Sequence, residues 1–77
     1  MRIRCDFNHK DERGRVRLDT PDSEEDIGAL GADAWSGRHV RIYDEGGYQA
    51  EGILEFVDGI WRARIVPNTG RRTKANE

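Results

Sequence analysis

Three side chains in this sequence, Cys5, His9 and His39, are of the types that bind metal ions or act as nucleophiles. A structural zinc site needs four well-spaced ligands, and Cys5 is the only cysteine of the chain. Cys5 also lies in an alternating stretch, Arg2 to Phe7, that points it toward the interior, where cysteine behaves as a small hydrophobe. We therefore expect no catalytic residue, no metal site and no cofactor, and we expect that the protein is not an enzyme.

Carboxylates and glycines offer no stronger signal for catalysis. Paired acids can perform acid-base chemistry, but in the expected strand register Glu51 faces Arg41 and Glu55 faces Arg62, so we interpret both as halves of cross-strand ion pairs. Gly46 and Gly47 form a turn and lack the spacing of a phosphate-binding loop.

Arginines are the next candidates, because clustered basic groups grip nucleic-acid phosphates and release counterions. Exposed aromatic rings for base stacking would be Tyr43, Tyr48 or Trp35. The alternative is that an acidic helix folds beside the arginines and neutralises them, and we favour this interpretation. The candidate nucleic-acid residues are Arg2, Arg4, Arg15, Arg17, Arg71, Arg72 and Lys74.

The third candidate is a protein-binding surface on the outer face of the last expected hairpin, Tyr48 to Val66. The inner face of this hairpin is already apolar, so apolar residues on its outer face need a second cover. Two interpretations are equally supported. Either a short helix of the same chain covers these residues, or a protein partner or a second copy does so, by burying the patch or by adding a strand at an open edge. The candidate partner-binding residues are Ile53, Val57, Ile60, Arg62 and Arg64.

Composition places these candidates on one small domain. The chain has 77 residues, of which 35% are hydrophobic and 36% charged, with a formal net charge of -2, so neither disorder nor a strongly charged partner is indicated. We expect a single β-rich domain over residues 1–66 and a disordered basic tail over 67–77. One cysteine excludes an intramolecular disulfide, and no apolar run suits a signal peptide or membrane span, so we expect a cytoplasmic protein without membrane contact.

The elements that position these residues are predicted from alternation, turns and caps. Cap residues and acidic groups predict a helix from about Pro21 to Leu30, and Trp35 after it is expected to pack over one end of the sheet. The expected strands are Arg2 to Phe7, Gly14 to Leu18, Arg38 to Asp44, Tyr48 to Val57 and Ile60 to Val66.

The first two strands are expected to form a hairpin with Ile3 opposite Leu18 and Cys5 opposite Val16. On its outer face this register sets Arg4 beside Arg17, where like charges destabilise a sheet. Docking of the acidic helix against these arginines would relieve the conflict.

The other strands form a meander whose registers follow from its turns. A glycine turn at residues 45–47 places Ile42 opposite Ala50, and Asp58-Gly59 fits a two-residue type I′ turn that places Phe56 opposite Trp61 on the inner face. Gly52 is expected to mark a kink or bulge.

The predicted fold class is mainly β (α+β): a small curved antiparallel sheet or barrel of about five strands, with one short helix between strands two and three. The segment from Gly37 to Ile42, a turn, and then Glu51 to Glu55 resembles the core of small SH3-like barrels, including Tudor-like and KOW-like modules. That fold serves many functions and transfers none. We expect a small non-enzymatic interaction or accessory module that binds a protein or itself, with an RNA- or DNA-binding SH3-like domain as the alternative.

Overall fold

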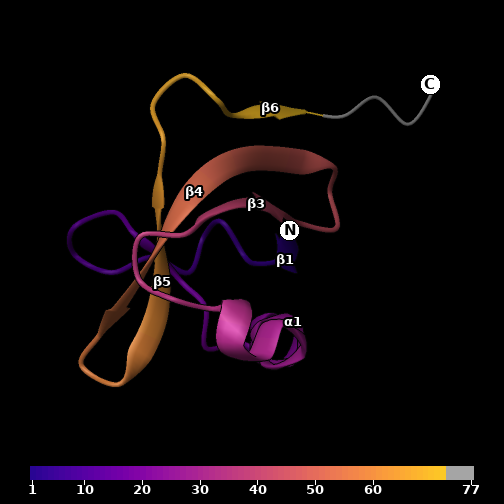
Figure 1. Ribbon diagram of the computed structural model, residues 1–77. Coiled ribbons are helices and arrows are strands. Elements are labelled where there is room, and N and C mark those ends of the chain that lie inside the picture. The colour runs from indigo at the N-terminus through magenta and orange to yellow at the C-terminus, as the bar shows by residue number, and fades with distance from the viewer. Residues whose placement is uncertain (73–77) are drawn as a thin grey trace.

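The computed structural model describes residues 1–72 and shows a curled, mostly β structure with one short helix (Figure 1). This confirms the predicted fold class, although the sheet is mixed and forms a half-barrel. The predicted helix and the long central strand have the expected bounds. The elements are β1 (Arg2–Arg4), β2 (Val16–Arg17), α1 (Pro21–Leu30), the 3-10 turn η1 (Gly31–Asp33), β3 (His39–Tyr43), β4 (Tyr48–Val57), β5 (Ile60–Ile65) and β6 (Arg71–Arg72).

The sheet has the order β1-β3-β4-β5-β2, and β6 pairs with the start of β4. Strand β1 runs parallel to β3, with Ile3 beside Ile42, whereas β2 runs antiparallel to β5, with Val16 beside Ala63. The predicted hairpin between the first two strands is therefore wrong, because they lie at opposite ends of the sheet. This topology still buries Ile3 and Val16, and it removes the repulsion expected between Arg4 and Arg17.

Both registers of the meander are confirmed. Ile42 lies opposite Ala50, and Phe56 lies opposite Trp61. Asp58 and Gly59 both have positive φ, 53° and 79°, as a type I′ turn requires.

Gly52 forms no bulge, because it pairs regularly with Val40 on β3 and Ile65 on β5. A Cβ atom at Gly52 would lie 3.2 Å from the Cβ of Ala63, so close approach of the chains accounts for the glycine.

Helix α1 is capped by Thr20, whose side chain accepts a hydrogen bond from the Ser23 amide, and it ends at Gly31, which has φ of 55°. It docks on the free edge of β1 through two side chains. The Ser23 hydroxyl donates to the Arg4 carbonyl oxygen at 2.6 Å, and the Arg4 amide donates to Asp26 Oδ2 at 2.8 Å. The helix thus satisfies backbone groups of β1 that would otherwise be open to another strand.

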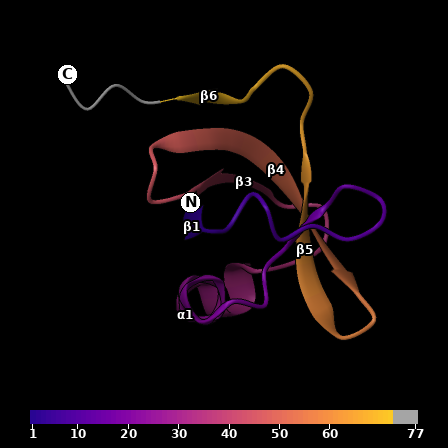
Figure 2. The same cartoon turned by 180° about the vertical axis from the view of Figure 1, so that it is seen from behind.

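The core lies between α1 and the inner face of the sheet. Two aromatic residues fall outside it, contrary to expectation: Phe56 is 52% exposed and Trp35 is 51% exposed. For Phe56 the reason is geometric, because the β4-β5 hairpin extends past the part of the sheet that α1 covers (Figures 1 and 2). The buried core consists of Ile3, Val16, Leu18, Ile27, Val40, Ile42, Ala50, Leu54 and Ala63.

Part of the expected disordered tail is instead paired to the sheet. Arg71 and Arg72 of β6 lie beside Gln49 and Tyr48 of β4, and the Thr69 side chain accepts a hydrogen bond from the Glu51 amide. Lys74 lies outside the described residues. Within the described part of the chain, no helix is long and apolar enough to cross a membrane.

Candidate interaction surface

The most exposed aromatic side chains gather near the tip of the β4-β5 hairpin. Phe56 and Trp61 face each other across the two strands, with ring centroids 4.9 Å apart and planes tilted by 56°. At the turn itself, Val57 pairs with Ile60, and both are half-buried.

The connector after η1 brings a further aromatic residue to this region. The Phe56 amide donates to Ser36 Oγ at 3.0 Å, and the Gly37 amide donates to the Leu54 carbonyl oxygen at 2.7 Å. Trp35 precedes this anchored segment, and the Arg38 guanidinium lies 5.5 Å from the centroid of its ring. We call Trp35, Phe56, Val57, Ile60 and Trp61 the hairpin-tip surface.

A groove of about 260 Å³ separates the hairpin tip from α1. Trp61 lines this groove and is also the partner of Phe56, so the groove continues the hairpin-tip surface. The full lining is Leu18, Asp19, Glu24, Ile27, Gly28, Gly59, Ile60 and Trp61.

Sequence reasoning missed most of this surface because it assigned Phe56 and Trp61 to a covered inner face. A signal was available, since both residues lie within two positions of the Asp58-Gly59 turn, where a hairpin runs beyond its neighbours.

The predicted outer surface is only partly open. Ile53, Val57 and Ile60 are half-buried, and of these three only Ile60 lines the groove beside α1. Arg62 is buried, and Arg64 is exposed with its Nε 2.9 Å from Glu55 Oε2.

The loop between β1 and β2 covers Arg62. Asp11 in this loop accepts hydrogen bonds from Arg62 Nη1 at 2.9 Å and Arg15 Nε at 2.8 Å. Glu55 pairs with Arg15 and Arg64, so the ion pair predicted between Glu55 and Arg62 is replaced by these contacts. Burial disfavours the charged form of Asp11, but the hydrogen bonds from Arg15 and Arg62 outweigh it and hold the pKa of this carboxyl well below its usual range.

The candidate nucleic-acid arginines do not share a face. Arg2 and Arg4 lie on β1 at one end of the sheet, and Arg17 lies on β2 at the other. Arg4 forms ion pairs with three acidic residues of α1, Asp22, Glu25 and Asp26, so the acidic helix neutralises this arginine as expected.

The remaining basic candidates are dispersed. Arg17 pairs with Asp19 at 2.7 Å, Arg2 lies 4.4 Å from the centroid of the Tyr43 ring, and Arg71 and Arg72 are exposed on β6.

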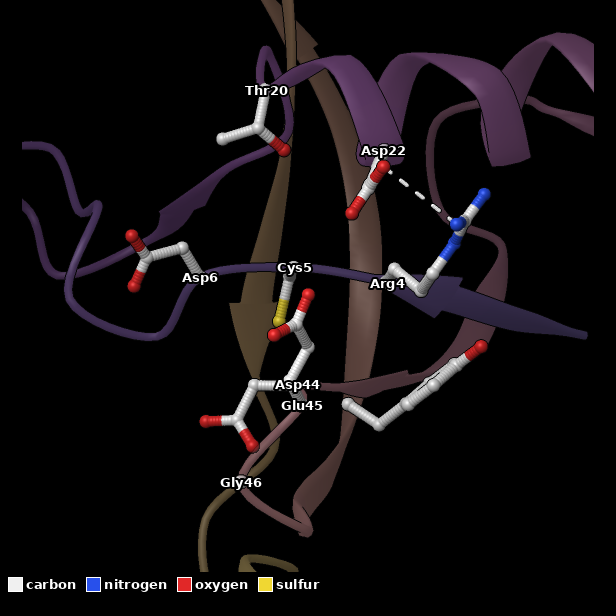
Figure 3. Close-up of a pocket in the computed structure, with 9 residues that line it drawn as sticks. Arg4, Cys5, Asp6, Thr20, Asp22, Asp44, Glu45 and Gly46 are labelled. Atoms are coloured by element: carbon white, nitrogen blue, oxygen red, sulfur yellow. Dashed lines mark ion pairs between the residues drawn. The ribbon is translucent and has the colours of Figure 1, made fainter.

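A larger cavity of about 410 Å³ lies between the end of β1, the start of α1 and the β3-β4 turn (Figure 3). Figure 3 shows the Cys5 thiol pointing toward the Asp44 carboxylate. Burial, assisted by the negative charges of Asp44 and Asp6, raises the pKa of Cys5 to about 12, so the thiol is protonated near neutral pH and is a poor nucleophile. The cavity lining is Arg4, Cys5, Asp6, Thr20, Asp22, Tyr43, Asp44, Glu45 and Gly46.

Among residues 1–72, no group of three or more His, Cys, Asp or Glu side chains is arranged to hold a metal ion. In comparisons with known proteins, no family model, no curated protein and no solved structure matched the chain.

Proposed function

We propose that this chain is a small non-enzymatic interaction module that binds a protein partner through the hairpin-tip surface. The observation that carries the proposal is the exposure of about half of both Phe56 and Trp35 near one end of the molecule. Aromatic side chains bury large areas and dominate the energetics of protein interfaces, so a contact here would gain the most from leaving water.

The state of the sheet edges favours contact through side chains over addition of a strand. Helix α1 occupies the backbone groups of Arg4 on β1. At the other end of the sheet, the loop before β2 occupies its backbone groups. The Arg17 amide donates to the His9 carbonyl oxygen, and Lys10 pairs with Val16 in an isolated antiparallel β-bridge. A partner strand therefore finds few free backbone groups at either end.

Site-specific photocrosslinking tests this proposal. A photoreactive phenylalanine analogue at position 56 should crosslink to a discrete protein in extracts of the source cell, and the same analogue at Arg13, an exposed loop residue, should not. Phe56→Ser in a chain that carries the crosslinker at Trp35 should reduce the yield. Equal crosslinking from positions 56 and 13 would contradict the proposal.

The nucleic-acid alternative has weaker support, because Arg4, Arg15 and Arg17 are already paired with carboxylates. A titration with mixed oligonucleotides at low and high salt discriminates between the two functions. Salt-dependent shifts centred on Arg2, Arg71 and Arg72 would favour nucleic acid over a protein partner.

A further inference from the structure

The groove between α1 and the hairpin tip has an apolar floor. Leu18 and Ile27 are buried beneath it, and the half-buried side chains of Ile60 and Trp61 form the wall on the hairpin side. Its volume of about 260 Å³ is smaller than the roughly 300 to 1,000 Å³ of typical small-molecule pockets, so it suits one large side chain better than a metabolite.

Two residues that line the groove are glycines and put no side chain into it. A Cβ atom added at Gly28 of α1, or at Gly59 of the β4-β5 turn, would have no heavy atom within 4 Å. Glycine in the middle of a helix is destabilising relative to alanine, so Gly28 is not explained by helix stability. It leaves a gap in the wall of the groove.

The rim of the groove is acidic. Asp19 and Glu24 both line it, and Asp58 is exposed at the hairpin turn that closes its far side. Asp19 is already paired with Arg17 and His9. Glu24 is exposed, and no cation of the described residues forms an ion pair with it.

We propose that this groove holds one large apolar side chain from a partner segment that carries basic residues on both sides of it. This inference rests on the function proposed above and names the chemistry of the partner. The apolar side chain would cover Ile27 and Trp61, while a flanking lysine or arginine would meet Glu24. The charge pairs would mainly select and orient the segment, because exposed ion pairs add little affinity.

The inference is tested with three labelled hexapeptides and the full chain. The test peptide has two leucines flanked on each side by two lysines. One comparison peptide has glutamates in place of the lysines, and the other has serines in place of the leucines. Binding is followed by fluorescence anisotropy and by the chemical shift of the Trp61 indole N–H.

We expect the leucine-lysine peptide to bind at least about tenfold more tightly than either comparison peptide, and less tightly as salt is raised. Gly28→Met should fill the groove and abolish this preference, whereas Ala29→Met, at the exposed neighbouring position of α1, should not. Glu24→Lys should weaken binding roughly two- to tenfold, and Glu12→Lys, on the exposed loop, should have no such effect.

Three results would overturn the inference. Equal binding of the serine-lysine peptide would show that charge alone is recognised, equal binding of the glutamate peptide would remove the role of the acidic rim, and unchanged binding to Gly28→Met would place the peptide elsewhere. If the peptides fail while crosslinking at position 56 persists, the groove chemistry is wrong and the proposed function stands. If the peptides fail to bind and the crosslink at position 56 is also absent, both the groove chemistry and the proposed function are contradicted.

Discussion

The buried hydroxyl of Ser23 is one of the groups that dock α1 on β1, and its removal gives the most direct test of this contact. Ser23 is 0% exposed and is the third residue after the cap Thr20, whose hydroxyl donates to Ser23 Oγ at 2.9 Å. Ser23 Oγ in turn donates to the Arg4 carbonyl oxygen at 2.6 Å. Ser23→Ala deletes this link with almost no change in shape, so the loss comes from hydrogen bonding and not from a cavity.

The expected loss in the free energy of unfolding follows from the Arg4 carbonyl, which Ser23→Ala leaves without its hydrogen bond. The Arg4 carbonyl faces the helix, away from β3, so it loses its partner while the helix still shields it. An unpaired buried acceptor costs about 1 to 3 kcal/mol. A chain of this length has a total stability of about 4 to 12 kcal/mol. For a domain of 60 to 100 residues, the substitution should lower Tm by about 4 to 24 °C.

Urea unfolding followed by tryptophan fluorescence measures this change, and hydrogen exchange localises it. The midpoint should fall with an unchanged slope, and the Arg4 amide, bonded to Asp26, should lose more protection than the Leu54 amide of the meander. Ser36→Ala is the matched control, because its hydroxyl lies at the surface and its loss should cost less than about 1 kcal/mol. A midpoint unchanged by Ser23→Ala, or lowered equally by both substitutions, would refute the proposed role of the hydroxyl.

Three further predictions concern single groups. Gly28→Ala should stabilise the fold by about 0.5 to 1 kcal/mol in the same unfolding assay, because alanine favours the helix and its Cβ meets nothing within 4 Å; a loss of stability would show that the groove wall is tighter than described. Cys5, with its pKa raised to about 12, should react with iodoacetamide at pH 8 far more slowly in the native chain than in urea, and equal rates would contradict its burial. Hydrogen bonds from Arg4 lower the pKa of Asp26, and those from Arg64 and Arg15 lower that of Glu55, so both groups stabilise the fold at pH values above their unfolded pKa of about 4. The urea midpoint should therefore drop as pH falls below about 4, and the drop should be smaller in Asp26→Asn; a midpoint constant down to pH 2 would exclude these contributions.

The parts of the fold that were predicted correctly are governed by residues close together in the chain. The register of β4 against β5 follows from Asp58 and Gly59, because these two residues favour the positive φ angles of a type I′ turn, which joins the strands in two residues. Helix α1 has its expected bounds because Thr20 caps its start and Gly31 ends it. These signals act over a few residues and do not depend on the rest of the molecule.

The pairing of β1 and β2 could not be obtained in this way. Alternation shows which face of a strand is buried, but it does not name the neighbouring strand. Ile3 would be buried equally well beside Leu18 or beside Ile42, and the second arrangement is adopted. The predicted pair of Glu55 and Arg62 was wrong for the same reason: Asp11, which binds Arg62, comes from a loop that sequence reasoning treated only as a connection.

The sequence by itself determined the helix, the two hairpin turns, the meander registers and the mainly β class, because each depends on local conformational preference and on the period of apolar residues. Tertiary structure alone decided that α1 seals the edge of β1 and leaves the hairpin tip uncovered. The physical reason is that the burial of a strand residue depends on whether the helix reaches the part of the sheet where it lies. Leu54 lies in the core that the helix covers, whereas Phe56, two residues further along the same face, extends beyond that core into solvent.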